Sequence, residues 1–502
     1  MGENNRSYRS YLILLVLSIL CGCMQSSKKI KALTPVDGEF SDLDPSELNS
    51  VSKYFILDNI GIKLLHVNHK NDYEMILARE IKVSEDKLRV NIKIKNLNFS
   101  DGSPIRAIDV ARSINRLIVR GSAHIPFKDF IKKENISTTL DTLSNAISIV
   151  GDDEIVLNLS KPTREILYYF TLADSVILHS SQILDRKLNV SDWSIVSGAY
   201  IPKQGNVLEK NNRYSYFTEN APDTVELVKM PLLGSFDDLK KADVGYSVFV
   251  KKDLASSDLL PVDYKYASDG FSTIVYLVLN SKDKRFSKLE NRQWLNCMIR
   301  KNFLKDLDTN PYYKKADQFF LEGSIAHQPS IELDNVLRCG ASVPDDLKNG
   351  ITIITAEKAK RFLVNNFQEK LQMSIGIPLK FIATDTPEKY RERQQTRDFE
   401  IYLVPTSASY NVASESLNLL YKSPKRMADN PNGKVLKAID RYQMYEGSDQ
   451  ENLREIVEQM TLESEIIPLF YQSSPKFYNS KTVDISKINP NESMTFWRMS
   501  VL

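Results

Sequence analysis

Hydrophobic side chains occupy every second position between residues 88 and 94 and alternate there with charged or amide side chains. This period of two predicts a strand with one buried face. Asp101-Gly102 predicts a turn, because glycine adopts positive φ without steric cost, and Pro104 fixes φ at the start of the next segment. In that segment the hydrophobic residues follow helical spacing: Ala107, Val110, Ala111, Ile114, Leu117 and Ile118. The stretch therefore predicts a strand, a turn and an amphipathic helix.

The same alternation of short strands and helices continues to the end of the chain. Further strands are predicted in residues 147–158, in a pair around Gly198 and Gly205, and in 272–279, 375–385, 399–405 and 463–479. Helices are predicted after Pro162, around Trp294 and near 389–395. No internal repeat, low-complexity tract or long linker interrupts this order. The sequence is that of a mixed α/β chain.

The N-terminus resembles an export signal. Arg6 and Arg9 precede ten mostly apolar residues, 11–20, which are too few for a membrane-spanning helix, since that needs roughly 20. The run ends at Leu20-Cys21-Gly22-Cys23, which resembles a bacterial lipobox. Cys23 is the predicted lipidation site, because small Gly22 precedes it whereas bulky Leu20 precedes Cys21. Export with cleavage nearby but without a lipid is the alternative.

The size and charge of the mature chain limit its class. Removal of residues 1–22 from 502 leaves 480 residues, which exceeds one ordinary core and predicts two or three lobes. The 66 Lys and Arg balance 64 Asp and Glu without a long run of one sign, so a nucleic-acid partner is not predicted. Cys297 and Cys339 could form a disulfide in an exported protein, and a buried free thiol is the alternative.

No local motif of catalysis is present. The sequence lacks a G-x-S-x-G elbow, an H-E-x-x-H motif and a phosphate-binding loop. His66 and His69 have no third ligand at metal-site spacing, and the S-x-x-K match at 84–87 falls in a polar turn. We therefore expect neither an enzyme nor a metal site nor a cofactor. A hydrolase with a site assembled from distant residues is a minor alternative.

Several segments together resemble one family, the extracytoplasmic solute-binding proteins of the oligopeptide and dipeptide type, which deliver ligands to ABC importers. The signature F-x-D-G-x-P followed by x-A-x-D-V is present as Phe99, Asp101, Gly102, Pro104, Ala107, Asp109 and Val110. Leu43-Asp44-Pro45, LNLSKPTREILYY, Ser197-Gly198-Ala199-Tyr200, YLVLN, NRQWLNCMIRK, IGIPLKF and IIPLFYQ occur in the family's order. The resemblance covers the chain from about Asp44 to its end.

The resemblance implies a periplasmic-binding-protein-like Venus flytrap with two main α/β lobes and a third domain, discontinuous in sequence. The expected limits are a lipoprotein signal peptide, 1–22; lobe I, 23–66, 185–270 and 475–502; an accessory domain with the signature, 67–184; and lobe II, 271–474. It also implies ligand contacts at Tyr246, Tyr276, Thr406, Ser407, Ala408, Ser409, Tyr410 and Tyr471.

The implied function is capture of peptides or related solutes, outside the cytoplasm, by a lipid-anchored monomer in the periplasm or at the cell surface. The implied partners are an ABC permease and its ATPase subunits. Two positions depart from the family: Arg106 replaces the Thr or Ser that caps the signature helix, and Ser409 replaces an Asp that binds the peptide amino group. A surface lipoprotein used for signalling, adhesion or cell-wall-fragment sensing, without transport, is the alternative that this loss favours.

Overall fold

The computed structural model describes most of the chain after the N-terminal segment. The described residues are 28–34, 40, 43–48, 51–122, 124–139, 142–182, 190, 192–229, 239–246, 262–267, 271–305, 313–328, 337, 340, 342–356, 367–384, 389, 392–393, 396–407, 413, 417–422, 427–430, 432–473, 476–489 and 494–502. No helix in these ranges is long and apolar enough to cross a membrane. Within the same ranges no group of three or more His, Cys, Asp or Glu side chains could hold a metal ion.

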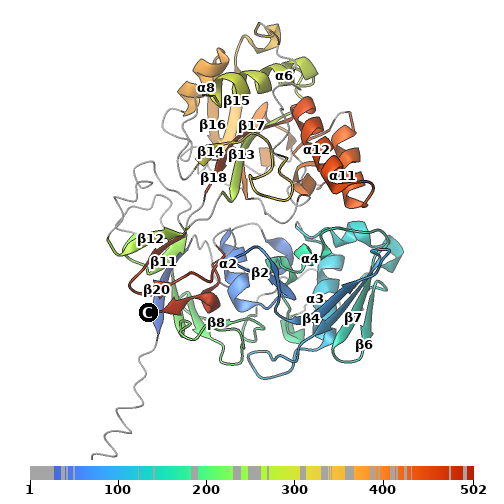
Figure 1. The fold of residues 1–502 in the computed structure, drawn as a ribbon, viewed down its shortest axis with the longest axis vertical. Helices are drawn as coiled ribbons and strands as arrows, with labels where there is room; N and C mark the ends of the chain where they lie inside the picture. Colours follow the sequence, from blue (N-terminus) through green and yellow to red (C-terminus); the bar gives the residue numbers. More distant parts are fainter. Residues whose placement is uncertain are drawn as a thin grey trace, which may run out of the picture.

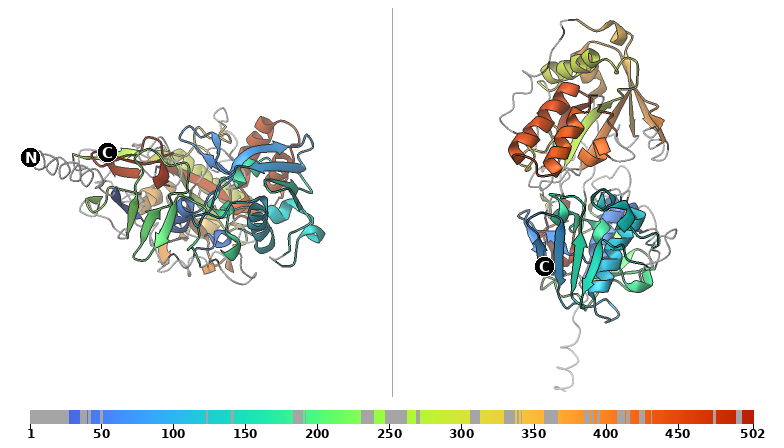
Figure 2. Two further views of the ribbon diagram at one scale, coloured as in Figure 1. Left: turned by 90° about the horizontal axis from the view of Figure 1, so that it is seen from below. Right: turned by 90° about the vertical axis from the view of Figure 1, so that its right-hand side faces the viewer.

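The molecule consists of two lobes stacked along its long axis (Figure 1). We call the part that contains strands β1–β12 and β19–β21 the lower lobe, and the part that contains β13–β18 the upper lobe. A side view shows helices α11 and α12 at the lower edge of the upper lobe, above the lower lobe (Figure 2). The predicted mixed α/β class is confirmed.

The lower lobe contains two large sheets. The seven-stranded sheet has the order β12 (Tyr264–Ala267), β19 (Lys476–Asn479), β11 (Val244–Tyr246), β1 (Lys29–Thr34), β10 (Thr224–Lys229), β9 (Val207–Lys210) and β8 (Tyr200–Lys203). The four-stranded sheet has the order β4 (Ala78–Val83), β5 (Arg89–Ile94), β7 (Glu154–Asn158) and β6 (Ile147–Val150). The short pairs are β2 (Leu65–Val67) with β3 (Tyr73–Met75), and β20 (Val483–Asp484) with β21 (Ser500–Val501).

The predicted strand, turn and helix of the signature are confirmed as β5 and α3 (Ala107–Arg120). Asp101 accepts a hydrogen bond from the backbone N–H of Ser103 at 2.9 Å, and Gly102 has φ 97°. Arg106 is the N-cap residue and its side chain makes no capping bond. Instead the Asp109 carboxylate accepts from the Arg106 backbone N–H at 2.9 Å, which satisfies one exposed donor at the helix start.

Both lower sheets and helices α2 (Val51–Ile60) and α3 share one hydrophobic core. α4 (Ile166–Tyr169) also contributes to it. Gly198 packs directly on the end of α2, since a Cβ there would lie 2.4 Å from the carbonyl carbon of Ile60. The predicted strand pair is the β8–β9 hairpin, which turns at Gly205, with φ 75°. Gly198 therefore serves close packing of the helix, and Gly205 serves the turn.

The upper lobe contains a six-stranded sheet with helices on both faces. Its order is β14 (Tyr313–Lys315), β18 (Ile466–Gln472), β13 (Thr273–Leu279), β17 (Ile401–Ser407), β15 (Ile351–Ala356) and β16 (Leu379–Thr384). Helices α11 (Lys434–Gln443) and α12 (Asp449–Glu463) share a core with one face, and α6 (Leu289–Met298) and α8 (Phe367–Ile375) with the other. Successive residues of β13 enter the two cores in turn, which explains why its sequence is hydrophobic throughout.

Short helices complete the described structure. The 3-10 helices are Pro45–Glu47, Phe127–Phe130, Lys133–Asn135, Ala173–Ser175, Ser180–Gln182, Asp345–Leu347 and Phe496–Arg498, and the π-helices are Ile299–Phe303 and Asn418–Lys422. Within the upper sheet, the register of β13 and β18 shifts between Val275 and Tyr276, which pair with Phe470 and Pro468. Proline has no N–H for the ladder, and this bulge accommodates it inside a central strand.

The chain passes between the lobes from β12 to β13 and again from β18 to β19, and we call these two connections the crossings. A hydrogen bond joins the two crossings at the upper lobe, where the Ser272 backbone N–H donates to the Gln472 carbonyl at 3.0 Å. In the lower lobe β12 and β19 are antiparallel neighbours, so both crossings connect to adjacent strands there. Two adjacent crossings form a connection about which two lobes can rotate as bodies.

Candidate functional site

The region between the lobes is the candidate site, because the predicted ligand residues fall on strands that reach it. Tyr246 ends β11, where it pairs in register with Lys476 of β19 beside the crossings. The side chain of Tyr246 is outside the described part of the structure. Thr406 and Ser407 end β17 and pair with Ile274 and Thr273 at the start of β13. The structure therefore brings these strand ends toward the same crossings.

Tyr276 and Thr406 are joined by a hydrogen bond inside the upper lobe. Their hydroxyl oxygens are 2.8 Å apart, and Tyr276 is fully buried, with its ring packed edge-on against Phe319. Burial raises the pKa of the Tyr276 phenol, so the hydroxyl stays protonated. Thr406 is half-buried. Tyr276 is thus a core residue with a satisfied hydroxyl, and its predicted contact with ligand stays a prediction.

Tyr471 is also in the core of the upper lobe, with 1% of its surface exposed. Its hydroxyl lies 2.7 Å from the Asp317 carboxylate and 2.9 and 2.7 Å from the carbonyl oxygens of Gln318 and Phe320. The ring of Phe271, at the crossing into β13, lies 6.3 Å from the ring of Tyr471. Tyr471 therefore fastens the end of β18 to residues 317–320, and its predicted ligand contact stays a prediction.

The other predicted site residues lie mostly outside the described residues. This is the case for Ala408, Ser409, Tyr410, Cys23 and Cys339, and for the side chain of Ser407. Cys297 lies on α6, as the helical pattern around Trp294 predicts, and it is disulfide-bonded. Its predicted partner Cys339 is among the residues that the structure does not describe.

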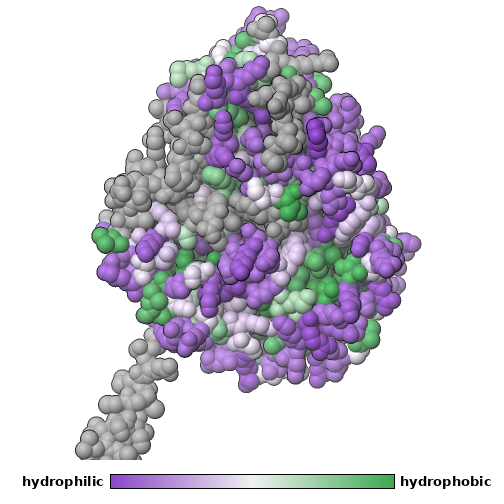
Figure 3. Space-filling model, viewed as in Figure 1, coloured by the Kyte–Doolittle hydropathy of each residue, from purple (hydrophilic) through white to green (hydrophobic). Residues whose placement is uncertain are grey.

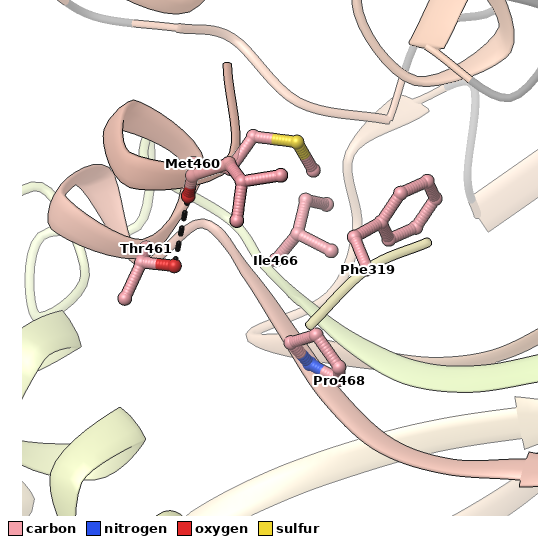
Figure 4. Close-up of a pocket in the computed structure, with 6 residues that line it drawn as sticks. Phe319, Met460, Thr461, Ile466 and Pro468 are labelled. Atoms are coloured by element: carbon pink, nitrogen blue, oxygen red, sulfur yellow. Dashed lines mark hydrogen bonds between the residues drawn. The ribbon is translucent and has the colours of Figure 1, made fainter. Parts of the chain in front are cut away.

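A cavity in the upper lobe is too small for a peptide. It has room for about one water molecule, and it is lined mainly by apolar side chains of α12, β18 and the segment after β14: Phe319, Val457, Met460, Thr461, Ile466 and Pro468 (Figure 4). The Thr461 hydroxyl donates to the Val457 carbonyl at 2.9 Å and leaves the cavity without a free polar group of its own. This cavity is a packing gap beside Pro468, and the ligand region must be sought between the lobes.

Sequence reasoning missed a group of residues that joins the lobes on the side away from the crossings. Arg164, which precedes α4 in the lower lobe, contacts Tyr442, Tyr445 and Asp449 in the upper lobe. The one sequence signal is an Arg in LNLSKPTREILYY, between a proline and an apolar run. Nothing in the sequence indicates that residues 278 and 285 positions later lie opposite it.

Hydrophilic residues cover most of the described surface in the view of Figure 3, and hydrophobic residues form small separate patches there. The region between the lobes is bounded by the crossings on one side and by the polar contacts of Arg164 on the other. This arrangement, with the lobes joined on both sides of the region, can enclose a solute between them. It does not bring together a described nucleophile, base and acid.

Comparisons with known proteins identify the relatives of this chain. Residues 72–427 match the family described as bacterial extracellular solute-binding proteins, family 5 Middle. A dipeptide-binding protein of Lactococcus lactis subsp. cremoris (strain MG1363) is 26% identical over 211 residues, which are 39% of this chain and 37% of that protein's length.

Solved structures show the same fold along nearly the whole chain. The dipeptide-binding protein from Pseudoalteromonas sp. SM9913 in complex with Met-Leu has a TM-score of 0.75 at 13% identity and covers 94% of this chain and 100% of its own. AgaA from A. tumefaciens R10 in complex with agropinic acid has a TM-score of 0.74 at 16% identity, with 94% and 99% covered. The family match spans most of the chain, and the fold of these binding proteins is that of this structure. The chain belongs to the bacterial extracellular solute-binding proteins, family 5.

Proposed function

We propose that this protein captures a peptide or peptide-like solute between its two lobes and delivers it to an ABC importer. The observation that carries the proposal is the two-lobed architecture, with two adjacent crossings on one side and a polar contact between lobes on the other, in a chain of the solute-binding family. The limits 23–66, 185–270 and 475–502 for lobe I, 67–184 for the accessory domain and 271–474 for lobe II are part of this proposal.

The strand ends beside the crossings suit recognition of an extended backbone. A peptide can pair with free backbone groups as a strand does, while its side chains enter hydrated pockets. Tyr246, Tyr276, Thr406 to Tyr410 and Tyr471 are the proposed contacts. Tyrosine offers a flat apolar face together with a hydroxyl, which suits ligands of varied sequence. For Tyr276 and Tyr471 the role is to shape the wall of the site, because their hydroxyls are already bonded inside the upper lobe.

The proposed anchor is a lipid on Cys23, and residues 25–31 would serve as a polar tether. The sequence has no phosphate-binding loop, so the energy for transport would come from separate ATPase subunits. The ligands bound in the two solved structures, Met-Leu and agropinic acid, differ in chemistry. Peptides are the substrate class that we propose, because the matched relative is a dipeptide-binding protein.

The test is native mass spectrometry of the mature protein, purified without denaturation, followed by calorimetry with the ligand that it releases. We expect one ligand per chain, recovered unchanged, and a peptide among the released molecules. Recovery of cleaved peptide, abolished by a substitution between the lobes, would replace binding by hydrolysis. Uptake of the labelled ligand by cells with and without this protein separates import from sensing, since a sensor leaves uptake unchanged.

A further inference from the structure

Arg164 binds the upper lobe through every part of its guanidinium group. Its Nε donates to the Tyr442 carbonyl at 2.6 Å, and its two terminal nitrogens contact the two carboxylate oxygens of Asp449 at 2.8 and 2.5 Å. The guanidinium carbon lies 3.9 Å from the centre of the Tyr445 ring. In return the Tyr445 hydroxyl donates to the Thr163 carbonyl at 3.2 Å. A bidentate ion pair, a cation–π contact and one further hydrogen bond thus meet on the Arg164 side chain, and the Tyr445–Thr163 bond lies beside them.

The place of Arg164 between two helices adds to this attraction. Tyr442 is in the last turn of α11, and Asp449 is the first residue of α12. Carbonyl groups without a helical partner give the end of α11 a partial negative charge, and Asp449 adds a full one. Only 15% of the Arg164 side chain is exposed, whereas 52% of the Asp449 side chain is exposed. The cation therefore sits in a partly desolvated site that is negative on two sides.

Tyr445 has a backbone conformation that a bulky residue rarely adopts. Its φ is 59°, in the left-handed region, at the position after a helix end where glycine or asparagine is usual. The next glycine, Gly447, is only two residues away in sequence and also has positive φ. A side chain kept at such a position is a sign of function when its contacts are specific. Here the contacts are with Arg164 and Thr163 of the opposite lobe.

This contact lies across the molecule from the crossings. Figure 1 shows α11 and α12 above α4 at the right, whereas β12, the strand from which the first crossing leaves the lower lobe, lies at the left. The residues that join are 278 to 285 positions apart in sequence and belong to different lobes. Rotation of the upper lobe about the crossings would separate these residues, because they belong to different lobes and lie on the side away from the crossings.

We propose that Arg164 is a latch that holds the lobes together from outside the ligand region and thereby sets the fraction of ligand-free molecules that are closed. In the closed state the lobes are together, and the contacts of Arg164 with the upper lobe are made. Because these contacts are absent in the open state, their full free energy favours the closed state. A ligand that needs the closed state then binds with an apparent affinity set partly by that fraction. Among the described residues, no hydrogen bond, ion pair or cation–π contact of Arg164, Tyr445 or Asp449 reaches a strand end of the proposed site, so affinity is tuned from a distance. The inference rests on the proposed function, since it takes closure to serve ligand capture.

The test measures lobe closure without ligand. Glu85 and Met373, exposed in the lower and upper lobes, are replaced by cysteine and labelled for single-molecule energy transfer in the full mature chain, freed of ligand. Arg164→Ala and Asp449→Asn should each raise the ratio of open to closed molecules about five- to tenfold. Arg164→Lys should open the lobes less than Arg164→Ala does. Lysine keeps the positive charge, but it cannot make the bidentate contact with Asp449 or stack on Tyr445 as a guanidinium does.

The matched control is Arg79→Ala. Arg79 also forms an arginine–aspartate pair, with Asp153 at 2.8 Å, but this pair is more exposed and lies inside the lower lobe, away from the junction. It should leave the ratio unchanged. If Arg164→Ala and Asp449→Asn match Arg79→Ala in the ratio while keeping the thermal unfolding midpoint, the latch is wrong. The ratio of open to closed molecules is measured without ligand, so it does not depend on whether the ligand is a peptide. If the variants leave this ratio unchanged while the protein still binds a peptide, the latch is wrong and the proposed function stands.

Discussion

The hydroxyl of Tyr471 donates a hydrogen bond to the carboxylate of Asp317, with 2.7 Å between the oxygens. Burial alone would raise the pKa of Asp317, but hydrogen bonds from His327 and Tyr471 and the charge of His327 lower it to about 2. Asp317 is therefore ionised at every physiological pH. The pair joins a central strand of the upper lobe to the segment that follows β14, so its first role is to stabilise that lobe.

Replacement of Tyr471 by Phe should lower the free energy of unfolding at pH 7 by about 1–2 kcal/mol, because buried acceptors lose their donor. Chemical denaturation measures this value. Since the folded pKa of Asp317 lies below its ordinary value of 3.8, the stabilisation is present above about pH 4 and is lost as the pH falls towards 2. The Asp317 side chain is 55% exposed, and solvent therefore screens its charge. The pH-dependent contribution of Asp317 to stability should be less than about 1 kcal/mol.

Tyr478→Phe is the control for this substitution, because its hydroxyl has no hydrogen-bond partner within the described ranges. It should leave the stability unchanged within about 0.5 kcal/mol. A Tyr471→Phe variant as stable as Tyr478→Phe, but with weakened ligand binding, would show that the hydroxyl serves the ligand rather than the lobe.

Local periodicity was enough to predict much of the fold. The alternation at 88–94 and the helical spacing at 107–118 correspond to β5 and α3, since each period reports which face of one element is buried. Partners across the chain leave no such trace. The bond between Tyr276 and Thr406 spans 130 residues, and that between Arg164 and Asp449 spans 285. Both depend on how finished sheets and helices pack, which no local pattern contains.

His66 shows the same limit, because it lies in strand β2 yet is 5% exposed and tilted against Trp497. Burial first, and then the charges of Lys63 and Arg498, lower the pKa of His66 well below its ordinary value of 6.5. The unfolded chain therefore binds a proton that the folded protein does not. Stability that is complete above pH 6.5 should be lost as the pH falls below that value.

Between pH 7.5 and 5.5 this single group accounts for a loss of up to about 1.4 kcal/mol in the free energy of unfolding. Over the same interval, the free energy of unfolding of His66→Gln should fall by about 1.4 kcal/mol less than that of the natural protein. Urea denaturation at both pH values measures this difference. His69→Gln is the control, since His69 is exposed. Equal pH sensitivity in the natural protein and His66→Gln would contradict this assignment.

The lipid anchor is a third prediction. Cys23 follows small Gly22, and the polar residues after it suit a tether to the membrane. Cys23→Ser should leave the protein unprocessed or release it from the membrane fraction, and it should abolish labelling with radioactive palmitate. Cys21→Ser is the matched control and should still be labelled. Labelling that survives in Cys23→Ser and disappears in Cys21→Ser would move the anchor to Cys21.

The fourth prediction concerns the amino terminus of a peptide ligand. The family resemblance implies an Asp that pairs with it, and the sequence has Ser409 there, outside the described residues. An ammonium group in a closed site is costly unless it is paired, and a hydroxyl cannot supply a charge. A charge-assisted hydrogen bond is about twice as strong as a neutral one. This chain should therefore not depend on a free amino terminus.

Calorimetry with two peptides of one sequence, one N-acetylated and one free, tests this. We expect dissociation constants within about tenfold of each other, which is a difference of about 1.4 kcal/mol. Glu415, six residues after Ser409, is the carboxylate that could take over the role, so each peptide is also measured with Glu415→Gln. A free peptide that binds a hundredfold more tightly, with the preference abolished by Glu415→Gln, would contradict the prediction. In that case the amino group is paired after all, and Glu415 has replaced the Asp of the family.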